Sequence, residues 1–202
     1  MVIGISPLVD FAFKLMLGSP QHSGVTIHFL NSILADQPKI THVKILNPFL
    51  GKESADDKLS VLDILATDEH GRFLNIEMQT SLSTGLSQRL TYYVASVYVG
   101  QLHEGHQYAA LRPAIRICVL TQALFAGSSA LHLDFRLRES SSDLILTDDL
   151  QIHLLPLNNG HPVKCSGGCC RSIASQFSLA SEPDLHGKII FSPYQDRPLI
   201  SS

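Results

Sequence analysis

Residues 58–79 contain two apolar, β-prone runs separated by a short polar cluster, and this pattern restricts the fold more than any other stretch. The runs at 61–66 and 73–78 have the composition of two strands, and the polar residues between them favour a turn. A three-residue loop at 69–71 fits this connection, because Gly71 can take the left-handed conformation that such loops need. The sequence therefore predicts a β-hairpin.

The predicted register of this hairpin brings two carboxylates and an amide to one face. Counting back from the loop sets Asp63 opposite Glu77, and Gln79 shares that face because side chains alternate along a strand. Like charges that face each other across a ladder destabilise it. A divalent cation such as Mg²⁺ between the two carboxylates would remove this conflict. The alternative is a solvated sheet face that holds no ligand, and a one-residue slip in register would undo the convergence.

Composition and charge restrict the class of protein. A chain of 202 residues is long enough for one domain with a hydrophobic core, and 45% hydrophobic residues argue against a largely disordered chain. The formal net charge of −3 gives no general signal for nucleic-acid binding, so DNA binding would need a local basic patch. No apolar run has the length of a transmembrane span, and the N-terminus lacks a signal-peptide pattern. We therefore expect no membrane association and a reducing cytoplasm.

Helical and extended patterns flank the predicted hairpin on both sides. Apolar residues recur at helical spacing in three segments: residues 6–17, 24–34 and 84–104. Short apolar or alternating runs indicate four further strands: residues 40–46, 114–120, 131–137 and 150–155. Residues 47–57 have the composition of a loop. Strands before and after a long helix favour an α/β fold with a mixed sheet.

Two of the predicted helices carry charged side chains whose roles the local sequence leaves open. Asp10 and Lys14 are four residues apart in the first helix, so they lie on one face, where they would form a surface ion pair. Arg89 lies in the first half of the long helix, close to Tyr93. Its guanidinium group could bind a phosphate or pair with a nearby carboxylate, and the local sequence leaves both roles open.

The character of the chain changes beyond Leu157. Residues 158–202 are rich in Gly, Ser and Pro without sustained periodicity, so we expect an irregular segment. Three of the four cysteines lie here, and with His161 they are a candidate zinc site whose spacing matches no standard finger or ribbon: Cys165, Cys169 and Cys170. Cys118 lies in an apolar run, which indicates a core thiol.

Several segments occur in an order that resembles the Rpn-type PD-(D/E)XK nuclease proteins, bacterial recombination-promoting nucleases often labelled as a transposase family. These segments are DFAFKLMLG, HFLNSIL, KLSVLDILATDEHGRFLNIEMQ, QRLTYYVASVYVGQLHEGHQY and PAIRICVL. The resemblance implies a restriction-endonuclease-like α/β fold, with a mixed sheet of about four strands flanked by helices. It covers about residues 7–157, and the sequence then turns unrelated. We therefore expect a nuclease-like domain at 1–157 and a non-native or truncated tail at 158–202.

The resemblance also implies a set of catalytic and metal-binding residues. Asp63 matches the aspartate of the first half-motif. The (D/E)XK half-motif matches residues 77–79, so Gln79 stands where lysine is usual in the wider superfamily. Asp63 and Glu77 would hold Mg²⁺ or Mn²⁺ and so activate a water molecule and stabilise the transition state. Gln79 can orient that water through hydrogen bonds, but it cannot act as a base or supply positive charge.

Further charged positions match the family outside this motif. Asp10 matches an acidic position of the first helix and would complete the metal site. Lys14 matches a basic position of the same helix, and Lys58 matches one just before the catalytic strand. Arg89 and Tyr93 match the RxxxY positions of the following helix. Lys58, Lys14 or Arg89 would supply the positive charge that the missing lysine brings elsewhere, and Lys14, Arg89 and Tyr93 would contact phosphate.

The function implied is that of a Mg²⁺- or Mn²⁺-dependent endonuclease of the bacterial cytoplasm, which hydrolyses DNA phosphodiester bonds in recombination or transposition. DNA is the expected partner, and a homodimer is expected if both strands are cut. No organic cofactor and no membrane are implied. The alternative is an inactive or decayed relative that binds DNA or its own copies without cutting.

Overall fold

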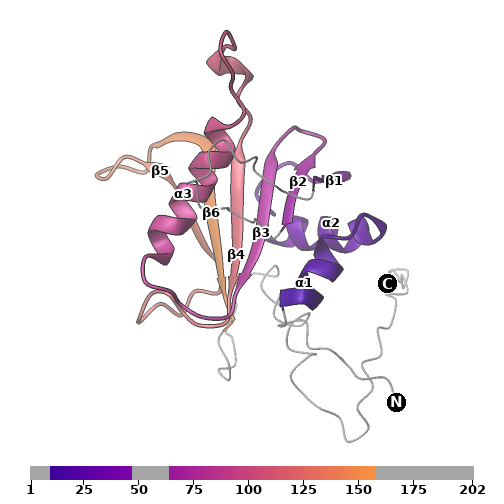
Figure 1. Cartoon of the computed structure of the whole chain (residues 1–202). Coiled ribbons are helices and arrows are strands. Elements are labelled where there is room, and N and C mark those ends of the chain that lie inside the picture. Colours follow the sequence, from indigo (N-terminus) through magenta and orange to yellow (C-terminus); the bar gives the residue numbers. More distant parts are fainter. Residues whose placement is uncertain (1–9, 47–63, 158–202) are drawn as a thin grey trace, which may run out of the picture.

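A six-stranded mixed β-sheet forms the centre of the computed structural model (Figure 1), which describes residues 10–46 and 64–157. The strands lie in the order β1-β2-β3-β4-β6-β5. Their bounds are Val43–Ile45 (β1), Ile64–Asp68 (β2), Phe73–Gln79 (β3), Ala114–Leu120 (β4), Leu133–Arg138 (β5) and Ile145–Pro156 (β6). Strands β3, β4 and β6 are parallel to one another, and the other neighbours pair antiparallel. The predicted mixed sheet is confirmed, with six strands in the described residues instead of about four.

Helices cover both faces of this sheet (Figure 1). Helices α1 (Asp10–Leu17) and α2 (Ser23–Ile33) pack on one face, and α3 (Leu86–Val99) packs on the other. Two short 3₁₀ helices, η1 (Pro20–His22) and η2 (Tyr108–Ala110), lie in the connections. Among the described residues, no helix is long and apolar enough to cross a membrane. A mixed sheet between helices is the α/β arrangement expected of a restriction-endonuclease-like fold.

The alternation of side chains along β3 determines what each face of the sheet contains. Leu74, Ile76 and Met78 point to the side of α1 and α2, where they share one hydrophobic core with Phe13 and Phe29. The alternate positions of β3 point towards α3 and include polar side chains. A strand that is buried on both faces therefore has one face that is apolar and another that carries charge.

The β2–β3 hairpin has the turn and the register that the sequence predicted. Residues 69–71 form the loop, and Gly71 has a φ of 78°, in the left-handed region that favours glycine. The antiparallel ladder sets Ile64 opposite Ile76. Residues 61–63 of the predicted first strand lie outside the described residues. The prediction of a three-residue hairpin loop is confirmed.

A buried ion pair closes this turn. Asp68 accepts hydrogen bonds from the backbone N–H groups of His70 and Arg72 at 2.9 and 3.0 Å and from Nε of Arg72 at 2.6 Å. The Arg72 guanidinium also donates to Oε1 of Gln37 at 2.8 Å and to the carbonyl of Pro38 at 3.1 Å. The turn is thus fixed to the segment that follows α2.

The predicted helix at 84–104 is wrong at its C-terminal end, because α3 ends at Val99. Gly100 follows the helix, and the next residue, Gln101, contacts Arg112 in the segment before β4. The side-chain amide of Gln101 donates to the carbonyl of Arg112 at 2.9 Å and accepts from its N–H at 2.8 Å. This pairing joins the segment after α3 to the start of β4, and no local pattern predicts it.

The last two strands form a longer hairpin than the sequence predicted. Strand β6 begins at Ile145, five residues before the predicted start of 150–155, and Ile145 pairs with Arg138 of β5. Most of this first part of β6 is exposed. Its sequence therefore lacks the alternation of apolar and polar residues that would predict a strand.

A buried histidine pair joins β6 to the segment before β5. His153 is fully buried, and its Nδ1 lies 2.8 Å from Nε2 of His132, with the two rings stacked. Its Nε2 lies 3.2 Å from Oε1 of Gln151 and 3.9 Å from Oδ1 of Asp134. Burial, together with the neighbouring His132, lowers the pKa of His153 to about 4.

We expect Asp68→Ala to destabilise the fold by about 3 kcal/mol or more, because it leaves the buried Arg72 guanidinium without its anion. Urea denaturation of the wild type and the variant measures this change. Asp143→Ala is the matched control: this carboxylate pairs with Arg138 at 3.0 Å but is 97% exposed, so little change is expected. Equal effects of the two variants would contradict the structural role of the turn.

We also expect the free energy of unfolding to fall as the pH drops from about 6.5 to about 4. In this window unfolded His153 binds a proton while folded His153 does not, so protonation favours unfolding by up to about 3 kcal/mol. Above pH 6.5 both states are neutral at this position and the effect vanishes. Urea denaturation from pH 7.5 to 4.5 measures it. His153→Gln should reduce the pH dependence, because His132, whose pKa burial also lowers, remains, and His42→Asn, at an exposed histidine, should leave it unchanged.

Candidate active site

Glu77 is a buried carboxylate near the C-terminal end of β3. Only 5% of the residue is exposed. Its neighbours Ile76 and Met78 belong to the core under α1 and α2, so Glu77 points to the α3 face. A buried carboxylate is costly unless charged or hydrogen-bonding partners replace water. Two arginines and a cysteine surround it: Arg89 of α3, and Arg116 and Cys118 of β4.

Arg116 is the nearest cation to Glu77. It pairs with Asn75 in the parallel ladder of β3 and β4, and it is fully buried. Its Nη2 contacts Oε2 of Glu77, and its Nη1 donates to Oδ1 of Asn75. Asn75 in turn donates to the carbonyl of Ile64 at 3.0 Å. The guanidinium carbon lies 4.8 Å from the ring centre of Tyr93, in a cation–π contact.

The second oxygen of Glu77 faces a thiol and a more distant cation. The Sγ of Cys118 donates to Oε1 at 3.4 Å, and Nη2 of Arg89 lies 3.9 Å from the same oxygen. Burial raises the pKa of the Cys118 thiol, and the negative charge of Glu77 raises it further. Cys118 is therefore a protonated donor, and the predicted core thiol is confirmed as buried.

The two arginines have more donor groups than the described residues can satisfy. Nε and Nη2 of both Arg89 and Arg116 are buried without a hydrogen-bond partner among these residues. The contact of Arg116 Nη2 with Glu77 is an ion pair by distance, although it does not have hydrogen-bond geometry. In the described part of the site, two cations face one carboxylate, so positive charge is in excess.

The structure brings several of the predicted site residues together. Glu77 and Arg89 lie within ion-pair distance, and Tyr93 covers the arginine that binds Glu77. Gln79 lies two positions after Glu77 on the same face of β3, at the end of the strand. It is half-buried, and its side-chain amide donates to the carbonyl of Met78 at 3.3 Å.

Other predicted residues are not placed beside Glu77. Asp63 and Lys58 lie outside the described residues, as does the side chain of Asp10. Helix α1 packs on the opposite face of the sheet, against the core that contains Ile76. The half-buried Lys14 belongs to this helix and so to the face of the sheet opposite Glu77.

The contribution of Arg116 to the site is not predicted from the sequence. Residues 114–120 have the pattern of a buried apolar strand, which gives no role to the arginine at its centre. The available signal was the charge itself, because an arginine flanked by Ile115 and Ile117 in a strand with no exposed position needs a buried anion. Which anion it meets depends on the pairing of β4 with β3, which is not local.

The donor set fits a divalent ion through Glu77. In the described ranges, no group of three or more His, Cys, Asp or Glu side chains could hold a metal. Mg²⁺ is commonly held by one or two protein carboxylates, with the other ligands from water and substrate. Glu77 therefore fits as one ligand, provided that Arg116 releases Oε2.

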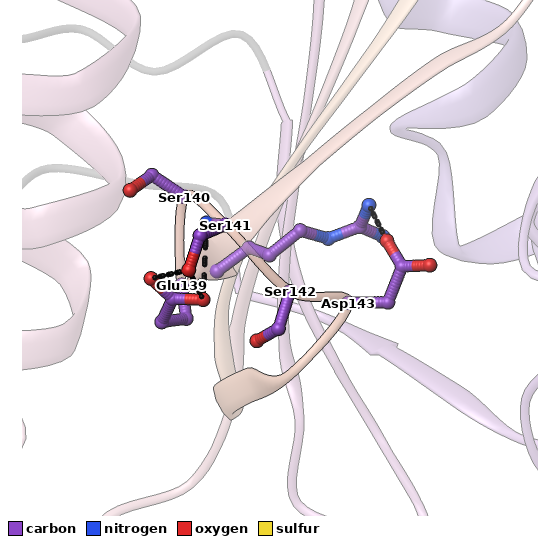
Figure 2. Close-up of a pocket in the computed structure, with 6 residues that line it drawn as sticks. Glu139, Ser140, Ser141, Ser142 and Asp143 are labelled. Atoms are coloured by element: carbon purple, nitrogen blue, oxygen red, sulfur yellow. Dashed lines mark hydrogen bonds and ion pairs between the residues drawn. The ribbon is translucent and has the colours of Figure 1, made fainter.

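A pocket at the β5–β6 connection is separate from this cluster (Figure 2). Figure 2 shows Ser141 directed at Glu139, and its hydroxyl lies 2.9 Å from the carboxylate oxygens. Hydrogen bonds from Ser142 and Ser141 lower the pKa of Glu139 to about 2. These side chains are exposed and bond to one another, so the pocket is a surface turn that contains none of the residues around Glu77.

We expect Arg116→Met to destabilise the protein by about 3–5 kcal/mol, because it leaves the buried carboxylate of Glu77 without its nearest cation. Adding Glu77→Gln should recover part of this loss, because the amide carries no charge. Urea denaturation of the wild type, both single variants and the double variant gives the coupling energy. Additive effects would show that the two side chains do not interact in solution.

Comparison with known proteins identifies the family. A family model described as PD-(D/E)XK nuclease family transposase matches residues 7–165, which include every described residue of the site. No curated protein and no solved structure matches the chain. The match agrees with the mixed sheet between helices, and it supports a nuclease-related function. The chain belongs to the PD-(D/E)XK nuclease family transposases.

Proposed function

We propose that the protein is a Mg²⁺- or Mn²⁺-dependent DNA endonuclease that acts in the recombination or transposition of mobile elements. The observation that carries this proposal is Glu77, a buried carboxylate at the acidic position of the half-motif, in contact with cations on two other elements. Such a cluster in a chain of this family suits the hydrolysis of a phosphodiester, which gains negative charge in the transition state.

The register of the hairpin supports Asp63 as the second metal ligand. Ile64 pairs with Ile76, and continuing the same ladder by one residue would pair Asp63 with Glu77 on the α3 face. Both carboxylates would then hold the ion, with Asp10 as a further ligand. When bound, the ion supplies Lewis-acid stabilisation of the phosphate and an activated water.

The residues of the chain would share the remaining tasks. Gln79 would orient the attacking water, because an amide can both donate and accept hydrogen bonds. Arg89 would bind the phosphate and stabilise its developing charge, since guanidinium groups fit phosphate oxygens. Lys58 would add positive charge as a catalytic residue, and Lys14 and Tyr93 would contact the DNA backbone. Of the cations among these residues, Arg89 is the one that the described structure places near Glu77.

A second function is supported by one specific observation. The ion pair between Arg116 and Glu77 occupies an oxygen that a metal ion would need. In a non-catalytic relative this pair would be permanent, and the protein would bind DNA or a second copy without cutting. The two functions differ in whether a divalent ion reaches Glu77.

We expect the full-length protein to nick supercoiled plasmid with Mg²⁺ and not with EDTA. Asp63→Ala and Glu77→Ala should each lower the nicking rate by roughly 100-fold or more, the scale of losing a group that stabilises transition-state charge. Gel electrophoresis of the plasmid measures the rate. Asp143→Ala, at an exposed carboxylate of the β5–β6 connection, should keep the wild-type rate.

Nicking that persists in EDTA, or that is equal in Glu77→Ala and the wild type, would contradict the endonuclease. If the wild type binds DNA and neither it nor any variant nicks the plasmid, the result would favour the non-catalytic alternative.

A further inference from the structure

We propose that Arg116 and Arg89 form a phosphate-binding pair whose affinity is controlled by Glu77, so that a phosphate and a divalent ion bind the site cooperatively. The inference deepens the proposed nuclease function and rests on it for the metal. The ligand is a phosphate oxyanion, either a phosphodiester of the nucleic acid or a free phosphate. It assigns to Arg116 a role that neither the motif nor the family match gives it.

Charge and geometry favour an anion with more oxygens than a carboxylate has. Arg116 approaches Glu77 from β4 and Arg89 from α3, so the two guanidinium groups converge from different elements. Glu77 contacts Arg116, but Arg89 stays 3.9 Å from its nearest oxygen. A phosphate offers several acceptors and fits the guanidinium fork through two parallel hydrogen bonds. It can therefore satisfy both arginines where one carboxylate cannot.

Donors that lack a hydrogen-bond partner among the described residues point to the same ligand, and one of them, Nη2 of Arg116, lies in ion-pair contact with Glu77. Four nitrogen atoms, Nε and Nη2 of each arginine, are buried without a hydrogen-bond partner among the described residues. Buried donors normally have partners, because leaving one unpaired is costly. The side chain of Arg89 is 36% exposed and that of Arg116 is fully buried, so a phosphate would approach from the side of Arg89 and reach Arg116 as Glu77 turns away.

Arg116 is also held in place independently of Glu77. Its Nη1 donates to Asn75, which is itself fixed to the carbonyl of Ile64, and the ring of Tyr93 covers the guanidinium. These contacts remain when Glu77 turns to a metal ion. The guanidinium therefore stays charged and oriented for a new anion, and binding loses little to reordering.

The competition makes the two ligands cooperative. A divalent ion at Glu77 removes the anion that competes with phosphate for Arg116. A phosphate on Arg116 likewise removes the cation that competes with the metal for Glu77. Linkage requires that each ligand tightens the other by the same factor, and such couplings are typically about 5- to 150-fold.

The first test measures Mn²⁺ affinity of the full-length wild type by electron paramagnetic resonance, with and without saturating inorganic phosphate. We expect phosphate to tighten Mn²⁺ binding about fivefold or more. Arg116→Met measured in the same buffers corrects for direct association of Mn²⁺ with phosphate, and it should lose the coupling. Arg138→Met, at a half-exposed arginine paired with Asp143, should keep it. Unchanged or weaker Mn²⁺ binding with phosphate would overturn the proposal.

The second test uses calorimetry with inorganic phosphate in EDTA. Glu77→Gln frees Arg116 without metal, so it should bind phosphate about fivefold or more tightly than the wild type. Glu77→Gln combined with Arg116→Lys keeps the charge and loses the fork, so it should bind less tightly than Glu77→Gln alone. If Arg116 served structure alone, phosphate affinity would be the same in the wild type and Glu77→Gln, which would overturn the proposal.

A third arm separates the two sources of phosphate. A short DNA duplex that displaces phosphate from Glu77→Gln assigns the pair to the nucleic-acid backbone, and failure to displace it assigns the pair to free phosphate. Both outcomes support the phosphate site. Plasmid nicking is scored separately, so a protein that couples phosphate to Mn²⁺ without cutting DNA retains this inference and loses the proposed function. A protein that cuts DNA without that coupling retains the function and loses the inference.

Discussion

The two-sided burial of β3 is the constraint on which the rest of the structure depends. Its apolar positions, Leu74, Ile76 and Met78, join the helices α1 and α2 in one core. That core fixes which way the alternate side chains point, so Glu77 is buried on the side of α3. The hydrophobic effect on one face thus positions the polar chemistry on the other, at a carboxylate that would otherwise avoid a buried strand.

Once Glu77 is fixed, its surroundings must supply positive charge. A buried ion pair is seldom the most stable choice, since desolvation of both ions offsets much of their attraction. An apolar pair at the positions of Glu77 and Arg116 would pack between β3 and α3 without that penalty. Asn75 and Tyr93 instead hold the arginine, and donors of two guanidinium groups have no hydrogen-bond partner among the described residues. Such an arrangement is easier to explain by ligand binding than by stability.

Local patterns were enough to predict the hairpin and most elements, and contacts distant in sequence explain what they missed. The turn at 69–71 needs only its own residues, so its loop and register were predictable. The early end of α3 is followed by the pairing of Gln101 with Arg112, which the residues of the helix do not predict. The role of Arg116 depends on the parallel neighbour β3, 41 residues earlier in the chain. A single sequence contains no signal for this pairing.

The same cluster gives a physical reason for the glutamine at position 79. A lysine there would share the α3 face of β3 with Glu77, where Arg89 and Arg116 already place two positive charges. Among the described residues Glu77 is the carboxylate of this cluster, so a third cation here would add repulsion to that of the two arginines. A neutral amide keeps the hydrogen-bonding capacity of the position and avoids this charge. In the proposed enzyme, Arg116 of β4 and Arg89 of α3 would supply the positive charge that the (D/E)XK lysine brings elsewhere, because both lie within ion-pair distance of Glu77.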